Sequence, residues 1–212
     1  DLLSPIYAHD EIEAITKAAR KRKRPFVLSL SPGPAPVENI KHLQSVAQLW
    51  RISEDFWDDW EGLKEQFAVC RKWQKYICKG HWPDADMLPI GPMAQRAMRG
   101  TPRMSNFTPD EQYTMLTLWA MFRSPLMIGC NLPEIDDFTL NLITNKEVLD
   151  INQYSKGNKE LFDRNGIIAW YAQSEDELTH YIAIFNTTDK DIESYTFPLQ
   201  TINYIGDGHI TD

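Results

Sequence analysis

Residues 48–60 read Gln48-Leu49-Trp50-Arg51-Ile52-Ser53-Glu54-Asp55-Phe56-Trp57-Asp58-Asp59-Trp60, an apolar run that passes into an acidic loop. The apolar part is typical of a buried strand. From Trp60 to Trp73 apolar side chains recur at helical intervals, which predicts a long amphipathic helix. A second strand and loop, rich in proline, follow at residues 81–91. A strand, a helix and a strand in this order predict two parallel strands joined by a crossover helix.

The same alternation continues in both directions along the chain. Four strands, each with its helix, amount to half of an eight-stranded barrel, which takes about 250 residues. On the N-terminal side we expect a helix that begins with a capping box of Asp10 and Glu13, a strand at 26–30 and a helix from about Pro36. On the C-terminal side we expect a buried helix from the capping box at 108–111 to Phe122, a strand at 126–129, and a helix at 135–152 with a break near Asn145.

The pattern changes after about Asp163. Short apolar runs separated by polar turns, at 167–171, 179–185 and 194–197, predict an antiparallel sheet. The sequence thus predicts an α/β fold: the C-terminal half of a (β/α)₈ TIM barrel at residues 1–160, then part of an antiparallel β-sandwich domain at 161–212. Too few strands are present to close either domain, so we expect both ends to be cut from a longer protein.

Composition argues against several classes of function. The 212 residues carry 22 basic and 30 acidic side chains, a formal charge of −8, which disfavours binding to a nucleic acid backbone. The basic run at 20–24 fits the end of a helix, with a nucleic acid or heparin patch as the alternative. No segment has the roughly 20 apolar residues that a membrane span needs. Three cysteines are too few for a disulfide framework or a zinc cage.

The loops that follow strand ends are where α/β folds collect functional residues. Arg51 ends a strand and Asp55 follows in an aromatic loop, a setting suited to general acid–base chemistry, although a purely structural loop is the alternative. Asp58 and Asp59 are interpreted as the start of the next helix. The run 84–86 could supply half of a metal site, but alternate residues of an extended segment face opposite ways, so no metal is expected.

These residues resemble a known family. Arg51-x-x-x-Asp55-Phe56-Trp57-Asp58-Asp59-Trp60, followed by Gly80-His81-Trp82-Pro83-Asp84-Ala85-Asp86-Met87-Leu88, is similar to glycoside hydrolase family 27, the α-galactosidases (melibiases) and α-N-acetylgalactosaminidases. The segments 118–127 and 145–153 add to the resemblance, which runs in order over nearly all of residues 1–200. It implies a retaining exo-α-glycosidase, most simply an α-galactosidase, in which two aspartates do the chemistry and no cofactor is needed.

The resemblance also implies roles for individual residues. Asp55 would be the catalytic acid/base, and the substrate-binding residues would be Arg51, Ser31, Trp82, Asp86 and Met87. Arg51 would bind the sugar and orient Asp55, Met87 would pack on the sugar ring, and Trp82 and Asp86 would form the wall and support. Ser31 lies in the segment 29–33, which stands where galactose-specific members carry a cysteine-containing segment that reads the C2 substituent.

The family nucleophile is the first aspartate of a Lys-x-Asp motif at the end of strand four. The better register places it one position before Asp1, with Asp1 itself as the other candidate. Three alternatives stay open: a member that acts on a β-L-arabinopyranoside or an α-glucan, a catalytically silent carbohydrate-binding relative, and a non-functional fragment. The expected partner is a carbohydrate, with neither nucleic acid nor membrane. A secreted or periplasmic location is favoured by the resemblance alone, and no oligomeric state is predicted.

Overall fold

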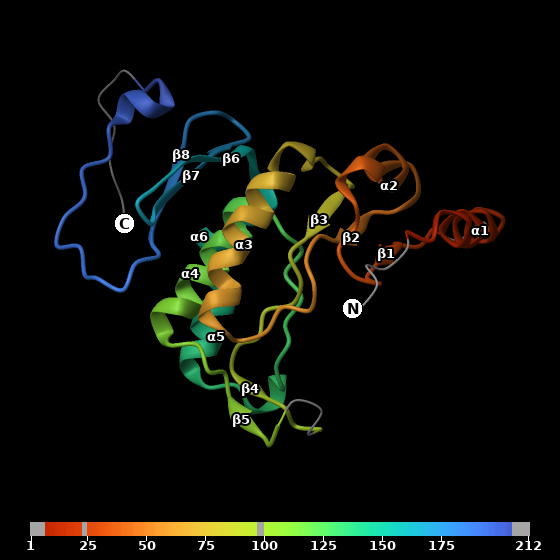
Figure 1. Ribbon diagram of the computed structural model, residues 1–212, viewed down its shortest axis with the longest axis horizontal. Coiled ribbons are helices and arrows are strands. Elements are labelled where there is room, and N and C mark those ends of the chain that lie inside the picture. Colours follow the sequence, from red (N-terminus) through yellow and green to blue (C-terminus); the bar gives the residue numbers. More distant parts are fainter. Residues whose placement is uncertain (1–6, 23–24, 97–99, 205–212) are drawn as a thin grey trace.

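A computed structural model describes residues 7–22, 25–96 and 100–204 of the chain (Figure 1). Asp1 and the segment 208–212 lie outside the described residues. The helices are α1 (His9–Arg20), α2 (Ile40–Val46), α3 (Trp60–Trp73), α4 (Pro109–Phe122), α5 (Asp137–Ile143) and α6 (Lys146–Tyr154). The strands are β1 (Ser29–Leu30), β2 (Leu49–Arg51), β3 (Trp82–Asp84), β4 (Pro92–Met93), β5 (Arg103–Met104), β6 (Ser155–Arg164), β7 (Ile167–Ser174) and β8 (His180–Asn186).

The first sheet is parallel, and its strands follow chain order. β1 pairs with β2 and β2 with β3, with Arg51 opposite Asp84. One further parallel bridge joins Leu88, which follows β3, to Ile128. The alternation of strands and helices therefore gives an α/β fold, as predicted. The strand expected at 26–30 is confined to its last two residues, and the one expected at 126–129 is reduced to the bridge at Ile128.

The helices form a layer beside the parallel strands. α3 and α4 lie next to each other, α6 packs on α4, and α1 lies beyond α2 at one end of the molecule (Figure 1). The capping box predicted for α4 is confirmed, because Thr108 and Glu111 each bond the other's backbone N–H. The capping box predicted for α1 is wrong: Ala8 caps that helix without a side-chain bond, and Glu13 contacts Lys17 and His42 instead.

The core joins the two layers. One hydrophobic cluster contains side chains from both layers, all of them completely or almost completely buried: Trp50 of β2, Leu88 after β3, Leu63 of α3 and Trp119 of α4. Because α4 is buried on nearly every side, its apolar composition needs no polar face. The break predicted near Asn145 is confirmed, since Asn145 caps α6 just after α5 has ended.

The C-terminal part is an antiparallel sheet of β6, β7 and β8 in that order. Strands were expected at 167–171 and 179–185 and are found there, but β6 was not foreseen and 194–197 is not a strand. The expected boundary at 160/161 falls inside β6, so we propose a division at 154/155 instead. The sheet packs on the helix layer through Phe185 against Phe67 and Trp170 against Phe122.

Candidate active site

The candidate site lies where β2 and β3 end. Arg51 is the last residue of β2 and Asp84 the last of β3, and the two are paired in register. Asp55 follows Arg51 by four residues, and Asp86 follows Asp84 by two. Parallel strands bring their carboxyl ends to one edge of the sheet, so all four side chains meet there.

Arg51 holds two carboxylates at once. Its Nη2 lies 2.9 Å from Asp86 Oδ2 and 3.4 Å from Asp55 Oδ1. The Arg51 side chain is 8% exposed, whereas that of Asp55 is 71% exposed. The arrangement therefore presents one accessible carboxyl group beside a buried cation. The Nε of Arg51 is buried and has no hydrogen-bond partner among the described residues.

Asp86 connects the other elements of the site. Its Oδ2 accepts a hydrogen bond of 2.7 Å from the backbone N–H of Phe56, the residue after Asp55. Its carbonyl accepts one of 2.9 Å from Trp119 Nε1. Its backbone has a φ of 84°, a left-handed conformation that is uncommon for residues other than glycine. That conformation turns the chain so that the carboxylate of Asp86 reaches back to Arg51 and to the loop of Asp55.

The Asp84 side chain stabilises this turn through a hydrogen bond with the backbone of Asp86. Its Oδ1 accepts a hydrogen bond of 2.9 Å from the N–H of Asp86. Burial raises the pKa of Asp84 to about 6, and the negative charge of Asp86 adds to the effect while Arg51 opposes it. Sequence reasoning considered Asp84 only as half of a metal site. Its position at the end of a strand, two residues before Asp86, was the signal for a supporting role.

Asp58 was also interpreted too simply. Asp59 caps α3, accepting from Gly62 N at 2.9 Å, but Asp58 turns the other way and binds Arg103 of β5 and the N–H of Asn106. Burial alone would raise the pKa of Asp58, but the hydrogen bonds from Arg103 and Asn106 outweigh it, and the pKa is lowered. A partner 45 residues away leaves no mark on the local sequence pattern.

Met87 and Ser31 lie in loops at the same edge of the sheet, whereas Trp82 does not. Met87 is half-buried and lies against Gly129, which follows the bridge residue Ile128. Ser31 is exposed in the loop after β1. Trp82 opens β3 at its opposite end and stacks on Arg123, 4.7 Å from the ring centroid, so it forms no wall of the cluster around Arg51.

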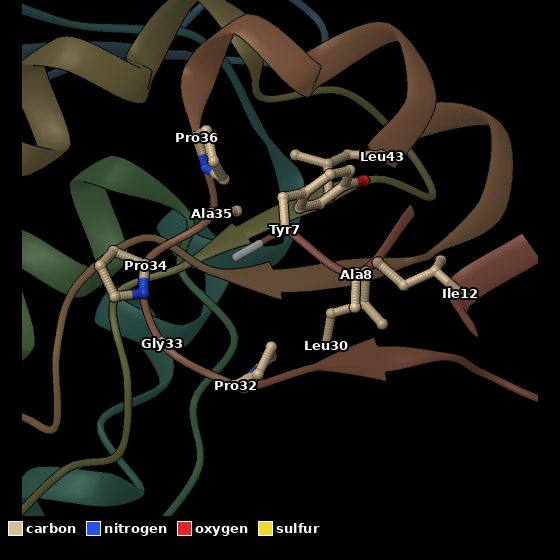
Figure 2. Close-up of a pocket in the computed structure, with 10 residues that line it drawn as sticks. All are labelled: Tyr7, Ala8, Ile12, Leu30, Pro32, Gly33, Pro34, Ala35, Pro36 and Leu43. Atoms are coloured by element: carbon tan, nitrogen blue, oxygen red, sulfur yellow. The ribbon is translucent and has the colours of Figure 1, made fainter. Parts of the chain in front are cut away.

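A small pocket lies apart from this cluster, between α1, the loop after β1 and α2 (Figure 2). Tyr7, Ile12, Leu30 and Leu43 are among its mostly apolar lining, and the centres of water molecules have about 30 Å³ there to occupy. The lining offers few side-chain hydrogen-bond partners to a sugar ring. Within the three described ranges, no group of three or more His, Cys, Asp or Glu side chains could hold a metal ion. Among the described helices, none is long and apolar enough to cross a membrane.

Comparison with known proteins places these residues in a family. The family model described as alpha galactosidase A (Melibiase_2) matches residues 8–154. Alpha-galactosidase 2 of Arabidopsis thaliana is 30% identical over 112 residues, which are 53% of this chain and 25% of that protein. Alpha-galactosidase A of Cellvibrio japonicus is 28% identical over 174 residues, 73% of this chain and 38% of that protein.

Two solved structures are more similar in sequence. A β-L-arabinopyranosidase of glycoside hydrolase family 27 from Geobacillus stearothermophilus is 46% identical, with a TM-score of 0.83, over 86% of this chain and 42% of that one. A putative α-N-acetylgalactosaminidase from Bacillus halodurans is 42% identical, with a TM-score of 0.70, over 85% of this chain and 41% of that one. The chain therefore spans less than half the length of these relatives. It belongs to glycoside hydrolase family 27, the melibiase family.

Proposed function

We propose that the full-length protein carrying this chain is a retaining exo-α-glycosidase, with Asp55 as its acid/base. The observation that carries the proposal is the group of Arg51, Asp55 and Asp86, in which one exposed carboxyl stands beside a buried arginine that is paired with the half-buried Asp86. We also propose that the parallel segments are strands five to eight of a (β/α)₈ barrel. Their chain order and common direction support this, as does the similarity to longer family members.

The proposed reaction is a double displacement at the anomeric carbon. In the first step the carboxyl of Asp55 gives its proton to the leaving glycosidic oxygen while a second carboxylate forms a bond to the sugar. In the second step the Asp55 carboxylate takes a proton from water, which attacks the same carbon and frees the sugar. The nucleophile belongs at Asp1 or one position before it, outside the described residues.

The other residues of the cluster would bind the sugar. Arg51 and Asp86 offer a donor and an acceptor at the base of the site, and Met87 offers an apolar surface to one face of the ring. Ser31 would face the C2 substituent. We leave Trp82 out of the proposed site because it packs on Arg123 at the other end of β3.

Terminal α-galactosides are the first candidate substrates. β-L-Arabinopyranosides are the second candidates. Their support is the 46% identity between this chain and an enzyme named for that activity. The two sugars share the configuration of their ring hydroxyls and differ by the hydroxymethyl group on C5. The same acid/base arrangement therefore suits both, and the choice depends on what contacts C5.

The test is hydrolysis of aryl α-galactoside, α-N-acetylgalactosaminide, α-glucoside and β-L-arabinopyranoside by the full-length protein and its variants. We expect selective turnover of one sugar. Asp55→Asn should lower kcat/KM by about 10²–10⁴-fold on an alkyl glycoside or natural disaccharide of that sugar, whose leaving group needs protonation, and by less on the aryl glycoside. Asp59→Asn is the matched control in the same loop, and it should keep the activity because asparagine also caps helices.

Two outcomes would contradict the proposal. Equal losses in both variants would mean that Asp55 has no special role. If no glycoside is cleaved, calorimetric titration with galactose and L-arabinose distinguishes the alternatives: binding without turnover identifies a silent carbohydrate-binding relative, and no binding removes the function altogether.

A further inference from the structure

The carboxyl group of Asp55 is poorly held by its own contacts. Its side chain is largely exposed, and the 3.4 Å approach to Arg51 Nη2 is at the long end of hydrogen bonding. Its position must therefore be set by the backbone of residues 52–59, the segment that joins β2 to α3. We call this segment the Asp55 loop.

The Asp55 loop is fixed on one side through Phe56. Besides the bond from Phe56 N to Asp86, the ring of Phe56 lies 5.0 Å from that of Trp119 and 6.1 Å from that of Phe107, measured between centroids. Phe56 is completely surrounded, because only 3% of it is exposed. This anchor belongs to the cluster already described.

The second anchor is Asp58, and it comes from outside that cluster. Both oxygens of its carboxylate, which is 3% exposed, are bound by the guanidinium of Arg103, with the Nη2–Oδ1 pair at 2.9 Å. The N–H of Asn106 donates to Oδ2 at 2.6 Å. A bidentate contact of this kind fixes the orientation of the Asp58 carboxylate as well as its distance from Arg103.

Arg103 is itself held firmly. It opens β5, which pairs with β4 in an antiparallel hairpin, and its Nη1 also donates to the carbonyl of Met104 at 2.9 Å. Ser105 ties the base of the hairpin to the segment after β3, through its N–H to Gly91 O and its hydroxyl to Pro89 O. The paired strands β4 and β5 are thus tied to the segment after β3, and the Arg103 side chain reaches from β5 to the Asp55 loop.

We propose that Arg103 is a positioning residue for the acid/base, acting through Asp58 to hold the Asp55 loop; the inference rests on the proposed function. Asp58 is three residues from Asp55, and its partners Arg103 and Asn106 come just before Phe107, on which Phe56 packs. Without Arg103 a buried carboxylate loses its charge partner, so the loop moves to hydrate it. A displacement of about 1 Å at a catalytic group costs on the order of 100-fold in rate.

The test compares leaving groups in the full-length enzyme. A dinitrophenyl glycoside departs with little protonation, whereas an alkyl glycoside or natural disaccharide depends on the acid. For Arg103→Gln we expect kcat/KM to fall by about 100-fold on the alkyl glycoside and only a few-fold on the dinitrophenyl one. Arg103→Lys keeps the charge but not the paired contact, so its loss should be intermediate.

Two further variants separate positioning from folding. Arg71→Gln is the matched control, because Arg71 likewise pairs with a buried carboxylate, that of Glu160, but outside the candidate site. Any fall in kcat/KM in this variant should be the same for both leaving groups. If Arg103→Gln does not fold, Asp58→Asn removes the ion pair without leaving a buried charge and should show the same leaving-group dependence.

A uniform loss on both substrates in the Arg103 and Asp58 variants, or no loss at all, would overturn the inference while leaving the proposed function intact. If the unmodified full-length enzyme cleaves neither substrate, the proposed function fails and the inference falls with it.

Discussion

Asp86 carries a backbone conformation that its residue type seldom adopts. Holding a non-glycine residue in the left-handed region costs about 1 kcal/mol or more. Three contacts of Asp86 maintain this conformation. Its N–H donates to the Asp84 carboxylate, its carbonyl accepts from the Trp119 indole, and its carboxylate pairs with Arg51. Each is a strong interaction with a partner that is largely or fully buried, so together they outweigh the cost.

The raised pKa of Asp84 predicts that the stability of the protein depends on pH. Its pKa in the folded protein is about 6, against an ordinary 3.8, so the folded state binds the proton more tightly than the unfolded one. The stability that this adds is complete below about pH 4 and is lost as the pH rises through 6, by roughly 3 kcal/mol. Asp84→Asn keeps the acceptor for Asp86 but cannot titrate.

Thermal unfolding of the full-length protein between pH 4 and 7 checks this. The difference in unfolding midpoint between Asp84→Asn and the unmodified protein should grow in favour of the variant as the pH rises, and level off above about pH 6. A difference that is constant across the range would show that Asp84 does not titrate in this window.

Gly129 gives a second prediction at this scale. A Cβ at this position would lie 2.7 Å from Met87 Sδ and 3.1 Å from the carbonyl oxygen of Leu88. The Met87 thioether is flexible and can move away from the added methyl group, whereas the backbone at Leu88 cannot. Gly129→Ala should therefore displace Met87 and raise KM several-fold with a smaller change in kcat. Steady-state kinetics on the preferred glycoside measure this, and an unchanged KM would remove Met87 from the sugar site.

At the scale of elements, Arg123 links α4 to the second sheet. It caps the end of α4 in the left-handed conformation and donates to three carbonyls where α6 passes into β6, those of Asn152, Gln153 and Ser155. Glycine would relieve a backbone cost of about 1–2 kcal/mol. It would also remove three charged hydrogen bonds that contribute roughly 1.5–3 kcal/mol each.

Arg123→Gly should therefore destabilise the protein despite its more favourable backbone. Denaturant titration of the full-length protein measures the change. Asn165→Gly, at another left-handed position in the turn between β6 and β7, is the control and should cost little. If the two variants behave alike, the carbonyl contacts of Arg123 contribute nothing to stability.

The elements that could be predicted from sequence are those with strong local signals. Helix α4 has a capping box, α3 has apolar periodicity, and β7 has a continuous apolar run. β6 was missed because its ten residues, 155–164, are mostly polar, and their pairing with β7 is decided by packing on the helix layer. Arg51 and Asp55 could be proposed because they lie close together at a strand end and match the family resemblance, whereas the partner of Asp58 is 45 residues away.

At the scale of the whole molecule, the parallel sheet has two outer edges. Within the described residues β1 has a partner on one side alone, and Ile128 forms the last bridge at the other edge. Large apolar side chains near both edges are exposed, among them Val27 at 68% and Met127 at 49%. Unpaired strands beside apolar surface are sites of association.

We therefore expect the 212-residue chain, expressed alone, to self-associate or to unfold without a sharp transition. Size exclusion with light scattering and a thermal melt measure both properties, with the full-length protein as the control. A sharply melting monomer would contradict the proposal that these strands are half of a barrel.

The bond between Arg103 and Asp58 also sets an order of events during synthesis. Asp58 leaves the ribosome 45 residues before Arg103, and at about 5–20 residues per second this interval lasts roughly 2–9 seconds. Throughout it, the nascent chain carries the Asp55 loop with its second anchor missing. The contact with Asp58 therefore forms only after β5 has emerged, and a ribosome that pauses between the two positions prolongs the period in which the Asp55 loop lacks it.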